Sequence, residues 1–127
     1  MTDKKKLGAK GEKFVIKYLK SNKYKILLRN YTTAYGEVDI IACNSENIVF
    51  VEVKTRTGDT LLPPRYAVDK KKRRRIVVSA NIFLTKYKTV LQPRFDVAEV
   101  KVDENGKMSV NYIEHAFGYK LDIYKEN

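Results

Sequence analysis

One stretch of the chain, Gly36–Arg56, limits the fold more than any other. Its first half, Glu37–Cys43, alternates polar and apolar residues, and its second half, Ile48–Lys54, is rich in β-branched and aromatic residues. The polar segment Asn44–Asn47 separates the two halves. Two such runs around a short polar turn predict a β-hairpin. We expect the rest of the fold to be built around these two strands.

The two faces of this hairpin should differ, because successive side chains of a strand point to opposite faces. The apolar face is expected to carry Val38, Ile40, Ala42, Val49, Val51 and Val53. The other face is expected to carry Glu37, Asp39, Ile41, Phe50, Glu52 and Lys54. Because Ile41 and Phe50 do not suit a fully solvated surface, this second face should be partly covered.

A symmetric turn also predicts the register of the hairpin. The expected pairs are Cys43–Ile48, Asp39–Glu52 and Glu37–Lys54. Directly opposed Cβ atoms lie about 5 Å apart, and opposed carboxylates are unfavourable unless a cation lies between them. A divalent cation would fill that role, because hard cations bind carboxylate oxygens. Lys54 follows Glu52 by two residues and should point to the same place.

The pattern alone leaves two alternatives to a metal site open. A β-bulge would shift the register and change the pairing of Asp39 with Glu52. Charged residues on the outer face of an antiparallel sheet are also usually solvated. In that case Glu37 and Lys54 would form an ordinary cross-strand ion pair.

Length and charge narrow the class of protein. The 127 residues fit a single domain, residues 1–127, with a core at about residues 7–118 and short polar tails. Lysine and arginine total 26 against 15 aspartate and glutamate residues, and the net charge of +11 favours a polyanionic partner, most often nucleic acid. The basic residues do not follow one long amphipathic face, so no membrane partner is expected.

No secretory or membrane-spanning segment is expected. Apolar runs are far shorter than the roughly 20 residues that span a bilayer, and the charged start Met1–Lys6 is not followed by an apolar segment. The single cysteine, Cys43, excludes an internal disulfide framework and fits a reducing cytoplasm. The single His115 cannot build a Cys/His zinc site. The sequence therefore predicts a cytoplasmic protein.

A helix is expected at Leu7–Leu19, where apolar residues recur at helical spacing. Gly8 and Gly11 fall within its apolar arc, although glycine inside a helix costs about 0.5–1 kcal/mol against alanine. Their presence predicts close approach of a neighbouring backbone. Glu12 lies at the edge of the arc, so it either leans toward the packed side or forms a surface ion pair.

A second helix should follow the six cations Lys70–Arg75, because apolar residues recur at helical spacing from Ile76 to Tyr87. Asp69 is its expected N-cap. Cations in the first helical turn oppose the helix dipole, and bound phosphate would compensate for this conflict. If the apolar stripe is extended backward into the basic run, Lys72 and Arg73 fall on its inward side. Lys71 and Arg74 then point outward. A solvated cap is the alternative.

The remaining strands complete a mixed α/β order. They are expected at Tyr24–Arg29, at Arg94–Val102 and, after the turn signal Asn105-Gly106, at Met108–Ile113. The resulting order α-β-β-β-α-β-β predicts a central mixed β-sheet of about five strands flanked by helices.

Two segments of this order are expected to be loops, Asn30–Tyr35 and Thr55–Pro64. Arg56 and Arg65 flank the second of them, which is expected to form a flap over the charged face of the hairpin.

The motifs carry a resemblance to a known family. Asp39, with Glu52-Val53-Lys54 on the next strand, matches the D…ExK part of the PD-(D/E)xK nuclease pattern, with Val38 at the proline position. GEKFVIKYLKSNKYKILLRNY, GEVDIIA, IVFVEVKTR, AVDKKKRRRI and RFDVAEV, in this order, resemble the YraN family of bacterial proteins. YraN proteins are similar to archaeal Holliday-junction resolvases, which implies a restriction-endonuclease-like fold and nuclease activity.

The resemblance also implies roles for the hairpin residues. Asp39 and Glu52 would bind a metal ion, and the backbone carbonyl of Val53 would complete the site. Lys54 would orient or help deprotonate the attacking water. Mg²⁺, with Mn²⁺ as an alternative, suits this set because Mg²⁺ keeps several waters and uses one or two protein carboxylates.

Further residues are implied around this centre. Glu12 matches a helical carboxylate that contributes to catalysis in resolvase-like members. Glu37 would bind the metal through water or pair with Lys54. The residues expected to contact nucleic acid are Arg56, Arg65, Lys71, Lys72, Arg73 and Arg74.

Three functions are compatible with these features. The first is a Mg²⁺-dependent endonuclease that acts on DNA by structure, since no motif for reading bases is present. The second is a catalytically silent nucleic-acid-binding module, and the third is a non-catalytic interaction scaffold. The likeness to dimeric resolvases leaves a homodimer open, and the sequence does not distinguish DNA from RNA.

Overall fold

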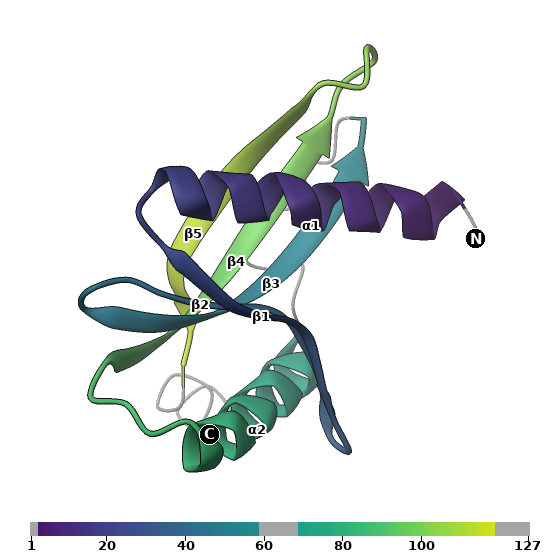
Figure 1. Cartoon of the computed structure of the whole chain (residues 1–127). Coiled ribbons are helices and arrows are strands. Elements are labelled where there is room, and N and C mark those ends of the chain that lie inside the picture. The colour runs from purple at the N-terminus through teal and green to yellow at the C-terminus, as the bar shows by residue number, and fades with distance from the viewer. Residues whose placement is uncertain (1–2, 59–68, 119–127) are drawn as a thin grey trace.

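The computed structural model describes residues 3–58 and 69–118 (Figure 1). Helices and strands follow one another in these ranges in the expected order. They are α1 (Asp3–Ser21), β1 (Lys25–Thr33), β2 (Gly36–Cys43), β3 (Asn47–Thr57), α2 (Lys70–Lys86), β4 (Gln92–Val102) and β5 (Met108–Phe117). Neither helix of the described ranges is long and apolar enough to cross a membrane.

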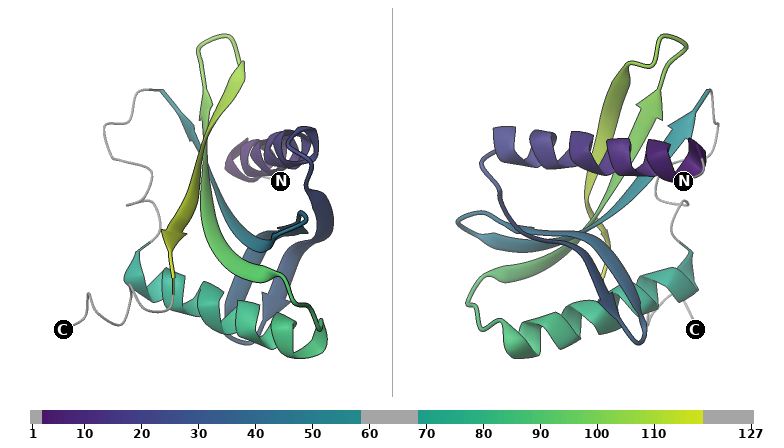
Figure 2. Two further views of the ribbon diagram at one scale, coloured as in Figure 1. Left: turned by 90° about the vertical axis from the view of Figure 1, so that its left-hand side faces the viewer. Right: turned by 45° about the vertical axis from the view of Figure 1, so that its right-hand side comes forward.

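The strands form one five-stranded sheet in the order β1-β2-β3-β4-β5. Neighbouring strands are antiparallel except β3 and β4, which are parallel and are connected through α2. Helix α1 packs on one face of the sheet and α2 on the other (Figures 1 and 2). The predicted α/β class and mixed sheet flanked by helices are confirmed, and the arrangement is consistent with the restriction-endonuclease-like fold.

Each face of the sheet buries its own apolar cluster. The cluster under α1 contains Val15, Leu19, Ile40, Ala42, Val49, Val51, Ala98 and Val100. The cluster under α2 contains Val38, Ile41, Ile48, Phe50, Ile76, Ala80, Phe83, Phe95, Val97 and Phe117. The predicted covering of the face with Ile41 and Phe50 is therefore confirmed.

The central hairpin has the predicted register as far as its ladder extends. Cys43 pairs with Ile48, and the pairing continues without a shift to Ile40 and Val51. The bulge that would have changed the pairing is absent from this stretch. The next position along the same register is that of Asp39, where the ladder has ended.

The first part of β2 follows β1 instead of β3. Glu37 lies opposite Thr32 of β1, whose hydroxyl donates a hydrogen bond to the carboxylate of Glu37 (3.3 Å). The expected pair of Glu37 with Lys54 is therefore wrong. Val38, expected on the same side as Ile40, packs in the cluster under α2. Val38 and Ile40 therefore point to different faces of the sheet, because β2 separates from β3 beyond the residues that pair in their ladder.

Strand pairing extends three elements beyond their expected ends. β1 continues to Thr33 because its last residues pair with the start of β2, so the loop expected at Asn30–Tyr35 is wrong up to Thr33. β3 runs alongside β4 as far as Thr57, and β5 continues to Phe117. β3 and β4 are separated in sequence by α2, so local patterns do not reveal their pairing. The loop expected at Thr55–Pro64 is therefore wrong for Thr55–Thr57, which belong to β3, and residues 59–64 and Arg65 lie outside the described residues.

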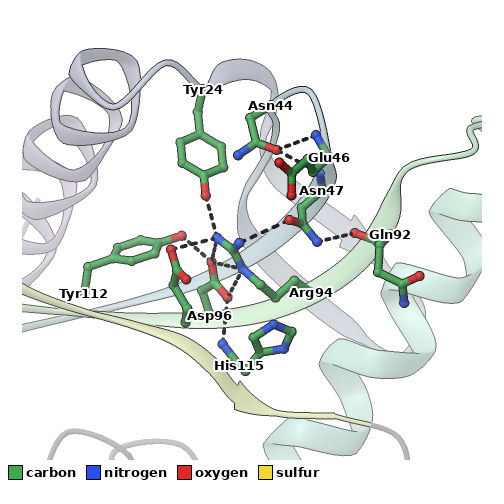
Figure 3. A network of polar contacts seen from close by, with 10 residues as sticks. Tyr24, Asn44, Glu46, Asn47, Gln92, Arg94, Asp96, Tyr112 and His115 are labelled. Carbon is green, nitrogen blue, oxygen red and sulfur yellow. Dashed lines mark hydrogen bonds and ion pairs between the residues drawn. The ribbon is translucent and has the colours of Figure 1, made fainter.

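A buried polar network joins the start of β4 to its neighbours (Figure 3). Arg94 is 5% exposed and Asp96 is fully buried, and the guanidinium donates to both carboxylate oxygens of Asp96 at 2.9–3.2 Å. Tyr112 donates to Asp96 at 2.6 Å, and Arg94 donates to the Tyr24 hydroxyl. Burial and the neighbouring Asp96 raise the pKa of Tyr112. The network ties β4 to β5 and to the segment before β1.

Close packing of α1 on β3 requires glycine at position 11. A Cβ atom built on Gly11 would lie 1.9 Å from the hydroxyl oxygen of Thr55. The expected close approach is confirmed there, but it is wrong for Gly8, where a Cβ atom would meet nothing within 4 Å.

Alanine at these two glycines is expected to have opposite effects on stability. Gly11→Ala should lower the free energy of unfolding by about 1–3 kcal/mol, because the added methyl group overpacks against Thr55. Gly8→Ala should raise it by up to about 1 kcal/mol, because alanine favours the helix and the site has room. Urea unfolding of both variants measures the difference. Equal effects would contradict the packing of α1 on β3.

Candidate functional site

Asp39 and Glu52 meet where β2 separates from β3. Their carboxyl groups lie close enough to act on each other directly, and Asp39 Oδ2 accepts the backbone N–H of Val53 at 2.8 Å. The side chain of Asp39 thus accepts a hydrogen bond from the backbone of β3 at the point where the β2–β3 ladder ends. Glu52 is 3% exposed, and both residues line a cavity of about 500 Å³. The predicted juxtaposition of these two carboxyl groups is present in the structure.

The pair is electrostatically unfavourable without a counter-charge. Burial, reinforced by the adjacent Glu52, raises the pKa of Asp39 far above its ordinary value. The hydrogen bond from Val53 opposes this shift but does not cancel it. Two carboxyl groups in such contact must share a proton or bind a cation, since both cannot ionise alone at this distance.

A cation from α2 meets this need in part. Lys72 Nζ lies 2.7 Å from Glu52 Oε2 and forms an ion pair with it. Although burial lowers the pKa of Lys72, the contact with Glu52 leaves this pKa above its ordinary value. Asp69 caps the helix by accepting the backbone N–H of Lys72 at 2.8 Å, as predicted. The cap fixes the first turn of α2 beside the carboxylates.

Lys54 is the second amine of the site. Burial and the positive charge of Lys72 lower the pKa of Lys54, and the nearby carboxylates Glu52 and Asp39 only partly oppose this shift. An amine with a lowered pKa can release and accept protons more readily than an ordinary lysine.

Basic residues form the rim of the cavity. Lys71 and Arg75 line it together with Lys72, and Gly36 forms part of its wall. A Cβ atom on Gly36 would lie 3.1 Å from Arg75 Cβ, so the start of β2 fits closely against α2. The predicted orientation of the basic run is confirmed, since Lys72 and Arg73 are half-buried while Lys71 and Arg74 are exposed.

Glu12 and Glu37 form a neighbouring acidic pair. Asn30, with its side-chain amide oriented to donate, lies 3.2 Å from Glu12 Oε1 and 3.1 Å from Glu37 Oε1. Burial raises the pKa of Glu12, and Glu37 adds to the shift while Arg29 opposes it. Glu12 therefore leans toward the sheet, and its charge is felt by Asp39 and Glu52.

The sequence as a whole matches a described family. Residues 11–100 fit the model of the uncharacterised protein family UPF0102. The chain belongs to UPF0102. This family is the YraN family, so the resemblance expected from the motifs is confirmed.

Several UPF0102 relatives align over almost their whole length. One from Geobacter metallireducens is 42% identical over 115 residues, which are 89% of this chain and 93% of the relative. One from Caldanaerobacter subterraneus is 40% identical, with the same coverage of both chains. One from Porphyromonas gingivalis is 41% identical over 91% of this chain and 84% of the relative. The solved structure of SSO0001 is 15% identical with a TM-score of 0.37. The alignment covers 97% of this UPF0102 chain and 57% of SSO0001, and the similarity between the two structures is weak.

The carboxylates of this UPF0102 protein suit a hard divalent cation that keeps water ligands. Asp39 and Glu52 offer oxygen donors beside each other, and burial together with Glu52 raises the pKa of Asp39, so a nearby cation would stabilise its charged form. Within residues 3–58 and 69–118, no three His, Cys, Asp or Glu side chains form a metal-binding group. Mg²⁺ fits this set because one or two protein carboxylates are enough for it. The carbonyl of Val53 remains a predicted ligand.

Not every predicted nucleic-acid contact of the UPF0102 chain faces the cavity. Arg56 Nε lies 3.1 Å from Glu99 Oε1, and Glu99 is 1% exposed. Arg56 therefore has a buried acidic partner on β4 that the sequence analysis did not find. Arg74 lies on a second cavity next to the first, and Arg65 is outside the described residues.

Sequence reasoning missed three features of this site. It assigned Lys72 to nucleic acid and did not find its ion pair with Glu52. It also missed Arg75 on the rim and Asn30 between the two glutamates. The inward turn of Lys72 was the one available signal, because an inward amine near two predicted carboxylates needs an acidic partner.

Proposed function

We propose that this UPF0102 protein is a metal-dependent endonuclease that hydrolyses phosphodiester bonds in DNA and recognises DNA structure rather than sequence. The observation that carries the proposal is the contact of Asp39 with Glu52 in a cavity rimmed by cations. Lys54 and Lys72 lie at the same carboxylates. Carboxylates beside amines suit a reaction in which a metal-held water attacks an anionic phosphate.

The residues divide the work of such a reaction. A divalent ion held by Asp39, Glu52 and the Val53 carbonyl would activate water and neutralise charge on the phosphate oxygens. Lys54 has a lowered pKa, so it can orient the attacking water and take up its proton. Lys72, released from Glu52, would offer its charge to the phosphate.

The charge of the chain supports a nucleic-acid substrate. The net charge is +11, and the first two turns of α2 place Lys71 and Arg75 on the rim of the cavity. Clustered cations favour binding of a polyanion and steer its approach.

A cleavage panel tests the proposed function. Linear, nicked, flapped and four-way DNA would be incubated with the purified protein and Mg²⁺, Mn²⁺ or EDTA. We expect cleavage with either metal, none with EDTA, and a preference among the four structures. Binding of DNA without cleavage under every metal condition would favour the silent binding module instead. Neither binding nor cleavage would favour the interaction scaffold.

Removing the amine of Lys72 is expected to strengthen metal binding. In Lys72→Met the metal no longer competes with an ammonium for Glu52. The affinity for Mn²⁺ should rise about three- to tenfold, as expected when a partly exposed ion pair worth about 1 kcal/mol is removed. Without metal, Lys72→Met should have a lower melting temperature than the wild type. The rise in melting temperature on adding metal should be larger for the variant than for the wild type.

Calorimetric titration with Mn²⁺ and thermal unfolding would measure both effects of Lys72→Met. Lys71→Met is the matched control, because Lys71 is exposed on the same rim and has no recorded contact with Glu52. Weaker metal binding by Lys72→Met than by Lys71→Met would contradict the proposed competition.

A further inference from the structure

The turn between β1 and β2 presents an aromatic side chain beside the carboxylate cavity. Tyr35 is 60% exposed and belongs to neither apolar cluster. It lines a second cavity of about 640 Å³ together with Arg74 and Val78 of α2. Gly36, Glu37 and Arg75 line both cavities, so the two hollows adjoin.

This turn is fastened to α2. The hydroxyl of Thr33 lies 2.8 Å from that of the buried Ser79 and also accepts the backbone N–H of Tyr35 at 3.0 Å. Gly36, the next residue, approaches Arg75 so closely that a Cβ atom would lie 3.1 Å from Arg75 Cβ. The backbone that carries Tyr35 is therefore held in place, although the core does not need its ring.

The chemistry around the ring matches one kind of ligand. Val78 is 39% exposed and adds apolar surface, and the two positive charges of Arg74 and Arg75 outweigh the single negative charge of Glu37 in the same hollow. A nucleotide combines a flat apolar base with an anionic phosphate, and bases stack on exposed aromatic rings in single-strand-binding proteins. A base within a duplex is already stacked on both sides, so only an unpaired base can use this ring.

We propose that Tyr35, Arg74 and Arg75 form a subsite for a nucleotide with an unpaired base, next to the phosphate that a metal ion at Asp39 and Glu52 would bind. This inference rests on the proposed nuclease function, because it places the carboxylate cavity at a DNA phosphate. It assigns the substrate class: single strands, and duplexes with flaps or other unpaired segments, bind in preference to continuous duplex.

A tryptophan probe tests the subsite directly. The chain contains no tryptophan, so Tyr35→Trp would place one indole at the subsite. Its fluorescence would be titrated with an oligothymidylate and with a blunt duplex of equal length, in EDTA so that cleavage plays no part. We expect strong quenching by the single strand and little by the duplex. The matched control, Val90→Trp, places the indole at a fully exposed site beyond the far end of α2 and should not be quenched.

Affinity measurements complete the test. By fluorescence anisotropy, Tyr35→Ala should bind labelled oligothymidylate about five- to a hundredfold more weakly, whereas Tyr35→Phe keeps the ring and should stay within about twofold. Equal losses for duplex and single strand, or equal quenching by both, would overturn the subsite. Cleavage of the DNA panel with no quenching would overturn the subsite and leave the nuclease proposal intact. Absence of both binding and cleavage would overturn both.

Discussion

Replacing Asp39 with asparagine is expected to lower metal-dependent DNA cleavage by about 10³-fold or more, with the fold retained. Asparagine has the same shape and can still accept the backbone N–H of Val53, but it removes the negative charge that a divalent cation needs. Glu52→Gln should behave in the same way. Rates measured on the preferred DNA of the cleavage panel, with circular dichroism as a check on folding, give the comparison.

Glu46→Gln is the control for the loss of an acidic charge. Glu46 lies in the turn at the other end of the same hairpin and is exposed, so its charge is remote from the cavity. This variant should cleave at the wild-type rate. Persistent cleavage by a clean preparation of Asp39→Asn would contradict the assignment of the carboxylates.

Replacing Arg94 with methionine is expected to lower the free energy of unfolding by about 3–5 kcal/mol. Asp96 is fully buried and accepts its charged hydrogen bonds from Arg94, so the variant would leave a buried carboxylate without its cation. Tyr112 and the backbone N–H of His115 still donate to Asp96, but neither supplies charge. Urea unfolding followed by circular dichroism measures the loss.

The double variant Arg94→Met/Asp96→Leu should recover part of this loss, because it removes both buried charges together. Glu114→Gln is the matched surface control. Glu114 is 59% exposed and lies 3.5 Å from Arg94, so losing its charge should cost less than about 1 kcal/mol. A cost for Arg94→Met no larger than that for Glu114→Gln would contradict the structural role of the network.

The central hairpin could be predicted because its information is local. Alternation and the turn Asn44–Asn47 were enough to give the register from Cys43–Ile48 to Ile40–Val51. The same register brought Asp39 and Glu52 together, although the ladder itself stops one residue short of them.

The contacts that sequence could not give are set by tertiary packing. Glu37 pairs along β1 rather than with Lys54, because β2 diverges from β3 beyond the residues that both strands share. Helical spacing turned Lys72 inward, but only the packing of α2 on the sheet places its amine on Glu52.

The buried pair on β4 was missed for a different reason. Arg94 and Asp96 interrupt an otherwise apolar strand, and polar residues that alternate with apolar ones normally indicate a strand with one solvated face. A strand between two helical layers has no outward face. Two opposite charges at positions i and i+2 share one side of a strand, which is the signal that could have predicted their pairing.

Binding of Mn²⁺ to the protein without DNA tests the central claim most directly, because it depends on the paired carboxylates and not on the substrate. Electron paramagnetic resonance distinguishes free from bound Mn²⁺ during a titration. We predict saturable binding of about one ion per chain in the wild type, lost in both Asp39→Asn and Glu52→Gln and kept in Glu46→Gln. A wild-type protein that binds no Mn²⁺, or an Asp39→Asn variant that binds it as well as the wild type, would contradict the account.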